Sequence, residues 1–100
     1  MLDIIRSGEE KAVKFALEGR LDTATVPKFE AELKGSLDSA SSLILDLGKL
    51  EYISSAGLRV LIMAQKAMKK QGGMKLVHVN ETVREILEVT GFSDILTIEV

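Results

Sequence analysis

The stretch EYISSAGLRVLIMAQKAMKK, residues 51–70, contains the junction that decides how this chain folds. Two serines, Ser54 and Ser55, separate a strand-like run from a helix-like run, and Ala56 and Gly57 follow them at once. Serine is a favoured N-cap because its side-chain oxygen accepts a hydrogen bond from a free backbone N–H of the first helical turn. We therefore predict a helix that begins at Ser54 or Ser55, with Ser54 as its cap.

Gly57 would stand inside the first turn of that helix, where glycine costs roughly 1 kcal/mol relative to alanine. Bare backbone at this point indicates either tight packing within the fold or the close approach of a partner, and the sequence leaves both readings open. The helix should end near Gln71, where Gly72 and Gly73 can supply a left-handed C-terminal cap.

The predicted helix has two different sides. At about 100° per residue, the side that faces the core collects small and apolar residues, namely Gly57, Val60, Leu61, Ala64 and Met68. The opposite sector holds Ser55, Arg59, Lys66 and Lys70. Ile62 and Met63 fall within or beside this polar sector. We predict that both are at least partly exposed and form part of a partner-binding surface beside Ser55, unless neighbouring loops cover them.

The rest of the chain alternates strand patterns with helix patterns. Apolar runs bounded by turn residues predict strands at residues 2–6, 12–17, 43–47 and 74–79. Helical spacing after cap-forming residues predicts helices at residues 25–37 and 81–90. Residues 95–100 are expected to form either a last strand or an apolar tail.

This order of elements predicts an α/β fold. Helices that connect consecutive strands require parallel strand pairs and right-handed crossovers. We expect a mixed, mostly parallel β-sheet with an N-terminal hairpin and with helices packed on it. Because 100 residues suit one compact domain and 46% of them are hydrophobic, we expect a single domain over residues 1–100.

The composition argues against several kinds of site and partner. The chain has no Cys, so it can form neither a disulfide nor a thiolate metal site. Its 13 basic and 15 acidic residues nearly balance, and only 4% of residues are aromatic, which argues against a nucleic-acid partner. No signal peptide is recognisable, and no apolar run approaches the roughly 20 residues that span a bilayer. We expect a cytoplasmic protein without a membrane partner.

Catalytic machinery is not recognisable in the sequence. The single histidine, His78, falls in the middle of the strand predicted at residues 74–79. Ser55 has Gly57 after it but Ile53 before it, so the glycine pattern of a hydrolase nucleophile is incomplete. One His without Cys cannot form a zinc site, and no phosphate-loop or dinucleotide motif is present. We therefore expect no enzymatic activity, no cofactor and no metal.

The position of Ser55 suits a phosphorylation switch. The free N–H groups and the dipole at a helix N-terminus both favour negative charge. A phosphate on Ser55 would leave the fold intact and add a charge of about −1.5 to −2 to the surface. The simpler reading is that the serines only cap the helix, and the sequence by itself does not decide between the two.

Two segments resemble the STAS domains, and specifically the bacterial anti-sigma factor antagonists. The more specific is DLGKLEYISSAGLRVLI, residues 46–62, in which the end of a strand leads through a short loop to a Ser-small-Gly-Leu helix start. The weaker is LEGRLDTATV, residues 17–26, which resembles the Gly-x-Leu-Asp segment that precedes the first helix of the family. With the order of elements, the resemblance covers essentially the whole chain.

The resemblance implies a definite function. Members of this family bind an anti-sigma factor that is also a serine kinase, and this binding frees the sigma factor. The kinase phosphorylates a serine at the start of the same helix, the antagonist then dissociates, and a serine phosphatase resets it. Alignment with the family motif places the phosphoacceptor at Ser55, while many members carry Asp where this chain has Ser54. The expected partner-binding residues are Asp22, Ser54, Ser55, Gly57, Arg59, Ile62 and Met63.

Other functions remain open at this point. The chain could be a STAS-type accessory subunit of a transporter or of a stress-sensing complex, in which no phosphorylation is needed. It could also bind a small molecule or nucleotide, although no phosphate-loop motif supports this. A kinase-type anti-sigma factor or a serine phosphatase encoded beside this gene would favour the antagonist.

Overall fold

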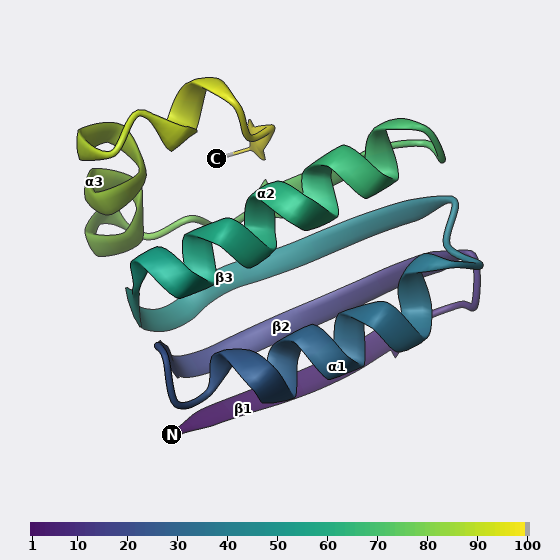
Figure 1. Cartoon of the computed structure of the whole chain (residues 1–100), viewed down its shortest axis with the longest axis horizontal. Helices are drawn as coiled ribbons and strands as arrows, with labels where there is room; N and C mark the ends of the chain where they lie inside the picture. The colour runs from purple at the N-terminus through teal and green to yellow at the C-terminus, as the bar shows by residue number, and fades with distance from the viewer. Residues whose placement is uncertain (100) are drawn as a thin grey trace.

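Five strands form one sheet, in which their spatial order is also their order along the chain. The computed structural model describes residues 1–99 and is shown in Figure 1. The strands are β1 (Leu2–Gly8), β2 (Ala12–Leu21), β3 (Ser42–Ile53), β4 (Met74–Val77) and β5 (Ile98–Glu99). The helices are α1 (Val26–Leu37), α2 (Ser55–Lys69) and α3 (Glu81–Val89), followed by a 3₁₀ turn, η1 (Phe92–Asp94).

The pairing of the strands confirms the predicted fold class. β1 and β2 form an antiparallel hairpin, whereas β2, β3, β4 and β5 pair in parallel. The last strand that the sequence left open is present as Ile98–Glu99, while Val100 lies outside the described residues. Among residues 1–99, no helix has the length and apolar character needed to cross a bilayer.

The core lies between the sheet and two helices on one of its faces. Figure 1 shows α1 and α2 side by side in front of the sheet, with α3 beyond the far side of α2. Alternate residues of β2 and β3 point to the helices and are buried, as the period of a strand requires. Phe15 of β2 and Phe29 of α1 meet edge to face, with ring centroids 6.4 Å apart, and tie α1 to the sheet.

β3 is longer than the sequence pattern predicts. The strand expected at residues 43–47 runs from Ser42 to Ile53, so that Asp46 lies within it and not at its end. Its buried residues Leu47, Leu50 and Ile53 are spaced by three, so this part of the sequence lacks the alternation of apolar and polar residues that is typical of a strand. The register of β2 against β3 shifts twice along this segment. Each shift adds one extra residue to β3, so that the next apolar side chain of β3 again points to the helices.

Further boundaries differ from the prediction, including that of β1, which runs to Gly8 and not to residue 6. β4 ends at Val77, so His78 and Val79 lie beyond the strand in which we placed them. His78 has a φ of 53°, a left-handed conformation that is incompatible with a continuing strand. β2 continues past residue 17 to Leu21, because its last residues pair with the unexpected second half of β3.

Candidate functional site

The N-terminus of α2 is held against the ends of β2 and β3 by backbone and side-chain hydrogen bonds from Ser54. Its N–H donates to the carbonyl oxygen of Leu21 at 2.9 Å, which extends the β2–β3 pairing by one step. Its Oγ accepts a hydrogen bond from the N–H of Gly57 at 3.3 Å. Ser54 is thus the N-cap of α2, as the sequence predicts.

Ser55 is the first residue of α2 and its side chain is exposed. Within residues 1–99, no protein group accepts a hydrogen bond from the N–H of Ser55 or of Ala56. These two donors and the helix dipole make the surroundings of the Ser55 hydroxyl favourable for negative charge. Arg59 follows one helical turn later on the same side of α2 and is exposed.

Asp22 begins the loop beside Ser54 and organises the start of α1. Because the N–H of Ser54 donates to the carbonyl oxygen of Leu21, Asp22, the residue after Leu21, is held near the N-terminus of α2. Its Oδ1 accepts hydrogen bonds from the N–H groups of Thr25 and Ala24, both at 3.1 Å. The bond from Thr25 is the main cause that holds the pKa of Asp22 below its ordinary value. Its carboxylate is thus engaged with α1, while remaining partly exposed.

A second pair of residues extends this surface and was not recognised in the sequence. Arg20 and Tyr52 lie opposite each other in the β2–β3 register. The guanidinium of Arg20 lies over the Tyr52 ring, 4.6 Å from its centroid, and Arg20 Nε is 3.9 Å from Oδ2 of Asp22. The sequence shows only that Arg20 precedes Leu21 and that Tyr52 lies two residues before Ser54. That these two residues are neighbours follows only from the β2–β3 register.

Gly57 is buried, and the structure supports the packing explanation for it. A Cβ added at Gly57 would stand 2.9 Å from side-chain carbons of both Ile53 and Leu21. α2 therefore approaches the ends of β2 and β3 more closely than any larger residue permits. Because Gly57 faces the core, we leave it out of the proposed partner-binding surface.

We predict opposite effects of alanine at two helical glycines. Gly57→Ala forces Ile53 and Leu21 apart and should lower the free energy of unfolding by about 1–3 kcal/mol. At Gly35 of α1, nothing in the described part of the chain lies within 4 Å of an added Cβ. Gly35→Ala should therefore raise the free energy of unfolding by roughly 0.5–1 kcal/mol through helix propensity. Urea unfolding of both variants measures the difference. A Gly57→Ala protein as stable as Gly35→Ala would contradict the packing explanation.

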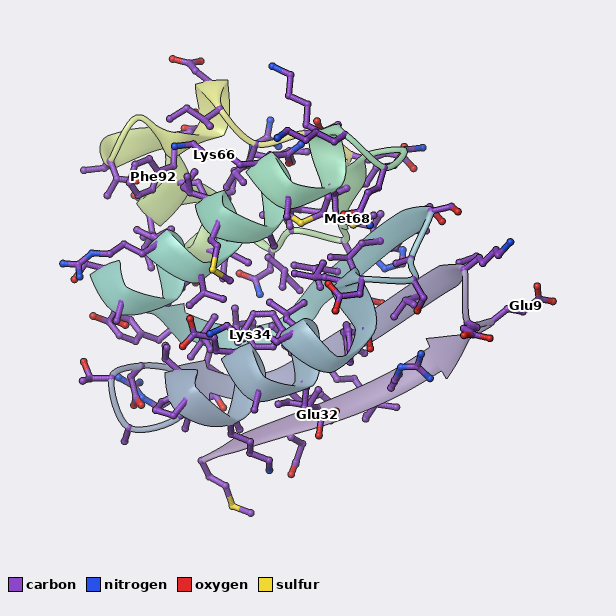
Figure 2. All side chains as sticks on the ribbon, turned by 45° about the vertical axis from the view of Figure 1, so that its right-hand side comes forward. Glu9, Glu32, Lys34, Lys66, Met68 and Phe92 are labelled. Carbon is purple, nitrogen blue, oxygen red and sulfur yellow. The ribbon has the colours of Figure 1, made fainter. Side chains whose placement is uncertain are left out.

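The predicted core face of α2 is confirmed, and the two apolar residues beside it are half-buried. Gly57, Val60, Leu61, Ala64 and Met68 are all buried, with Leu58 added to them. Figure 2 shows Lys66 on the outer side of α2 and Met68 beneath it. Ile62 and Met63 are intermediate in exposure, as predicted. At about 100° apart on the helix, they flank the Ser55 side and do not form one patch.

Asp46 and His78 form a separate cluster on the face of the sheet opposite α1 and α2. His78 Nδ1 lies 3.1 Å from Asp46 Oδ2, and Lys14 Nζ lies 4.0 Å from the same oxygen. Partial burial would raise the pKa of Asp46, but hydrogen bonds from Gly48 N–H and His78, with the nearby charges, outweigh it and lower the pKa. Asp46, Gly48 and His78 border a hollow of about 420 Å³. No group of three or more potential metal ligands occurs among residues 1–99.

Comparison with known proteins identifies the family to which the chain belongs. The family model described as the STAS domain matches residues 4–100. The chain belongs to the STAS domain family. The BtrV protein of Bordetella bronchiseptica, a candidate anti-sigma factor antagonist, is 39% identical over 84 residues, which cover 82% of this chain and 72% of BtrV.

Solved structures show the same fold for this STAS domain. An anti-sigma factor antagonist from Mycobacterium paratuberculosis superposes with a TM-score of 0.88 at 21% identity, covering 98% of this chain and 85% of that one. The phosphorylated form of the Bacillus cell fate determinant SpoIIAA superposes with a TM-score of 0.73 at 16% identity, covering 100% and 92%.

Proposed function

We propose that this STAS domain is an anti-sigma factor antagonist that binds an anti-sigma factor with serine kinase activity and thereby frees a sigma factor. Phosphorylation of Ser55 by that partner ends the interaction, and a serine phosphatase restores it. The observation that carries the proposal is the exposed Ser55 hydroxyl at the first residue of α2, beside two N–H groups that have no protein acceptor within residues 1–99.

The electrostatics of the helix support a switch that leaves the fold intact. The dipole and free N–H groups should stabilise a negative charge at Ser55 by roughly 0.3–1 kcal/mol. Arg59, one turn further along α2, adds a cation on the same side. The protein therefore tolerates the phosphate, and the added charge weakens the binding of a partner at this surface.

The partner-binding surface in this proposal consists of exposed and half-buried residues around Ser55. Arg59 continues it along α2, Ile62 and Met63 provide apolar contacts on either flank, and Asp22 borders it from the loop before α1. Ser54 contributes mainly as the cap that positions Ser55. The 39% identity to BtrV and the likeness to the phosphorylated form of SpoIIAA support the family function and the switch.

Mass mapping after phosphorylation tests the proposal. The chain is incubated with ATP and, one at a time, with the purified kinase-type anti-sigma factors of the same genome. We expect one phosphate on Ser55, none on Ser55→Ala, and unchanged modification of Ser54→Ala. Modification of Ser54 alone would reverse the roles of the two serines. Tight binding without phosphorylation by any of these kinases would favour an accessory subunit of a larger complex.

A further inference from the structure

β1 is the long edge of the sheet, and its outer side carries unpaired backbone groups. In the hairpin, Arg20 N–H donates to Met1 O and Glu9 N–H donates to Ala12 O, both at 3.0 Å. Because hydrogen-bonded pairs alternate along an antiparallel ladder, the odd-numbered residues of β1 bond to β2. The N–H and C=O groups of Leu2, Ile4 and Arg6 therefore point away from β2, outward from the edge of the sheet.

β1 lacks two of the usual devices that protect a sheet edge, and its charged residues are Asp3 and Arg6 alone. The register against β2 is regular over seven residues, without a bulge, and the strand contains no proline. Lys28 Nζ covers one group, the Leu2 carbonyl, at 3.2 Å. The Arg6 side chain is turned onto α1, where Nε donates to Ser36 Oγ at 3.2 Å. The backbone groups of Ile4 and Arg6 have no acceptor or donor among residues 1–99.

We propose that β1 pairs antiparallel with β1 of a second copy of this chain, about a two-fold axis perpendicular to the sheet at Ile5. Such an axis keeps the helices of both copies on the same side of one continuous sheet. Residues that face each other must then both be odd or both be even, and the even ones exchange the hydrogen bonds. The partner that best matches a regular strand edge of this kind is the strand itself.

Of the registers that satisfy these conditions, those centred on Ile4, Ile5 and Arg6 pair most of β1, and side chains favour one of these three. Centred on Ile4, the pairing puts the Asp3 carboxylate opposite the apolar Ile5. Centred on Arg6, it puts Asp3 opposite Glu9, two like charges.

Centred on Ile5, the pairing puts Ile5 against its own copy, where it covers a side chain that is 49% exposed in the monomer. Asp3 then faces Ser7, whose hydroxyl can donate to the carboxylate, and Ile4 exchanges backbone hydrogen bonds with Arg6.

Gly35 provides an independent observation for the same axis. Nothing among residues 1–99 of the same copy lies within 4 Å of a Cβ added there, so packing within this part of one copy does not require glycine in this helix. Gly35 follows Lys28 by seven residues and so lies on the same side of α1, the side that reaches the β1 edge. Figure 2 shows Glu32 on this side, between α1 and β1. In the proposed pair the two copies of α1 approach each other near Gly35, where bare backbone leaves room.

The pairing should be weak and should leave the Ser55 surface free. A strand edge buries less than the roughly 1,200–2,000 Å² of a stable interface, so association should depend on concentration. In Figure 1, α1 lies between α2 and the edge of the sheet that β1 forms, so β1 is far from the start of α2. The inference is therefore independent of the proposed function.

Sedimentation equilibrium tests the association. Between about 10 μM and 1 mM, the average mass should rise from 10.9 kDa toward twice that value. Ile5→Lys brings two cations together at the axis and should weaken association at least about tenfold. Ile95→Lys is the matched control, because Ile95 is 52% exposed and lies outside β1; it should associate like the unaltered chain. A constant mass of 10.9 kDa overturns the proposal.

Disulfide formation tests the register, since the chain has no cysteine of its own. A non-hydrogen-bonded pair has Cα atoms about 4.5 Å apart, within the range that a disulfide spans. Under mild oxidation, Ile5→Cys should form a covalent dimer, whereas Ile4→Cys and Ser7→Cys should not. Preferential cross-linking of Ile4→Cys would overturn this register. Dimerisation that Ile5→Lys leaves unchanged, or pairing of β1 only with added peptides, would overturn the self-pairing.

Discussion

Ser55→Asp should fold with near-native stability and lose at least about 100-fold in affinity for its anti-sigma factor. The unchanged stability follows from the position of Ser55. There the helix dipole and the N–H groups of Ser55 and Ala56, which have no acceptor among the described residues 1–99, favour a carboxylate as they would favour a phosphate. The loss of affinity follows because a charge without a partner in an interface costs several kcal/mol to desolvate, and each 1.4 kcal/mol corresponds to a factor of ten in affinity.

The matched control for this experiment is Ser39→Asp. Ser39 is exposed in the connection between α1 and β3, at the other end of the twelve-residue β3, so it introduces the same charge far from Ser55. We expect Ser39→Asp and Ser55→Ala to bind the partner like the unaltered chain in calorimetric titrations, while Ser55→Asp does not. Equal binding by the two Asp variants would remove the switch and leave only an interaction domain.

Asn80→Ala should lower the free energy of unfolding by about 2–4 kcal/mol, which corresponds to roughly 10–25 °C in Tm. The Asn80 side chain has two functions. Its Oδ1 accepts a hydrogen bond from Val83 N–H at 2.9 Å and caps α3. Its Nδ2 donates to the carbonyl oxygens of Leu50 at 2.7 Å and Leu47 at 3.1 Å, which holds the second half of β3 in place. Alanine removes the cap and leaves these carbonyls without that donor.

Two further variants separate the functions of Asn80. Asn80→Asp keeps an acceptor for the Val83 N–H but turns an oxygen toward the β3 carbonyls, so most of the loss should remain. Ser54→Ala removes only the cap of α2 and should cost about 1 kcal/mol. Thermal unfolding of the three variants gives the ranking. If Asn80→Asp were as stable as the unaltered chain, the contacts to β3 would contribute nothing.

The sequence by itself determined the features that depend on neighbouring residues. The spacing of Val60, Leu61, Ala64 and Met68 fixed the buried side of α2, because a helix repeats every 3.6 residues whatever it packs against. The Ser-Ser-Ala-Gly junction likewise placed the cap at Ser54 and left Ser55 exposed. The order of strands and helices was enough for the fold class, since connections through helices require parallel strands.

Other features were decided only by the tertiary structure, because they depend on which distant segments of the chain lie side by side. The second half of β3 exists because Glu18–Leu21 pair with it through two register shifts, which no local period reveals. The need for glycine at position 57 comes from Leu21 and Ile53 beneath it, and the place of His78 from its bond to Asp46. The free edge of β1 is likewise a property of the sheet. Strand register sets all of these contacts, and register depends on the packing of the whole sheet.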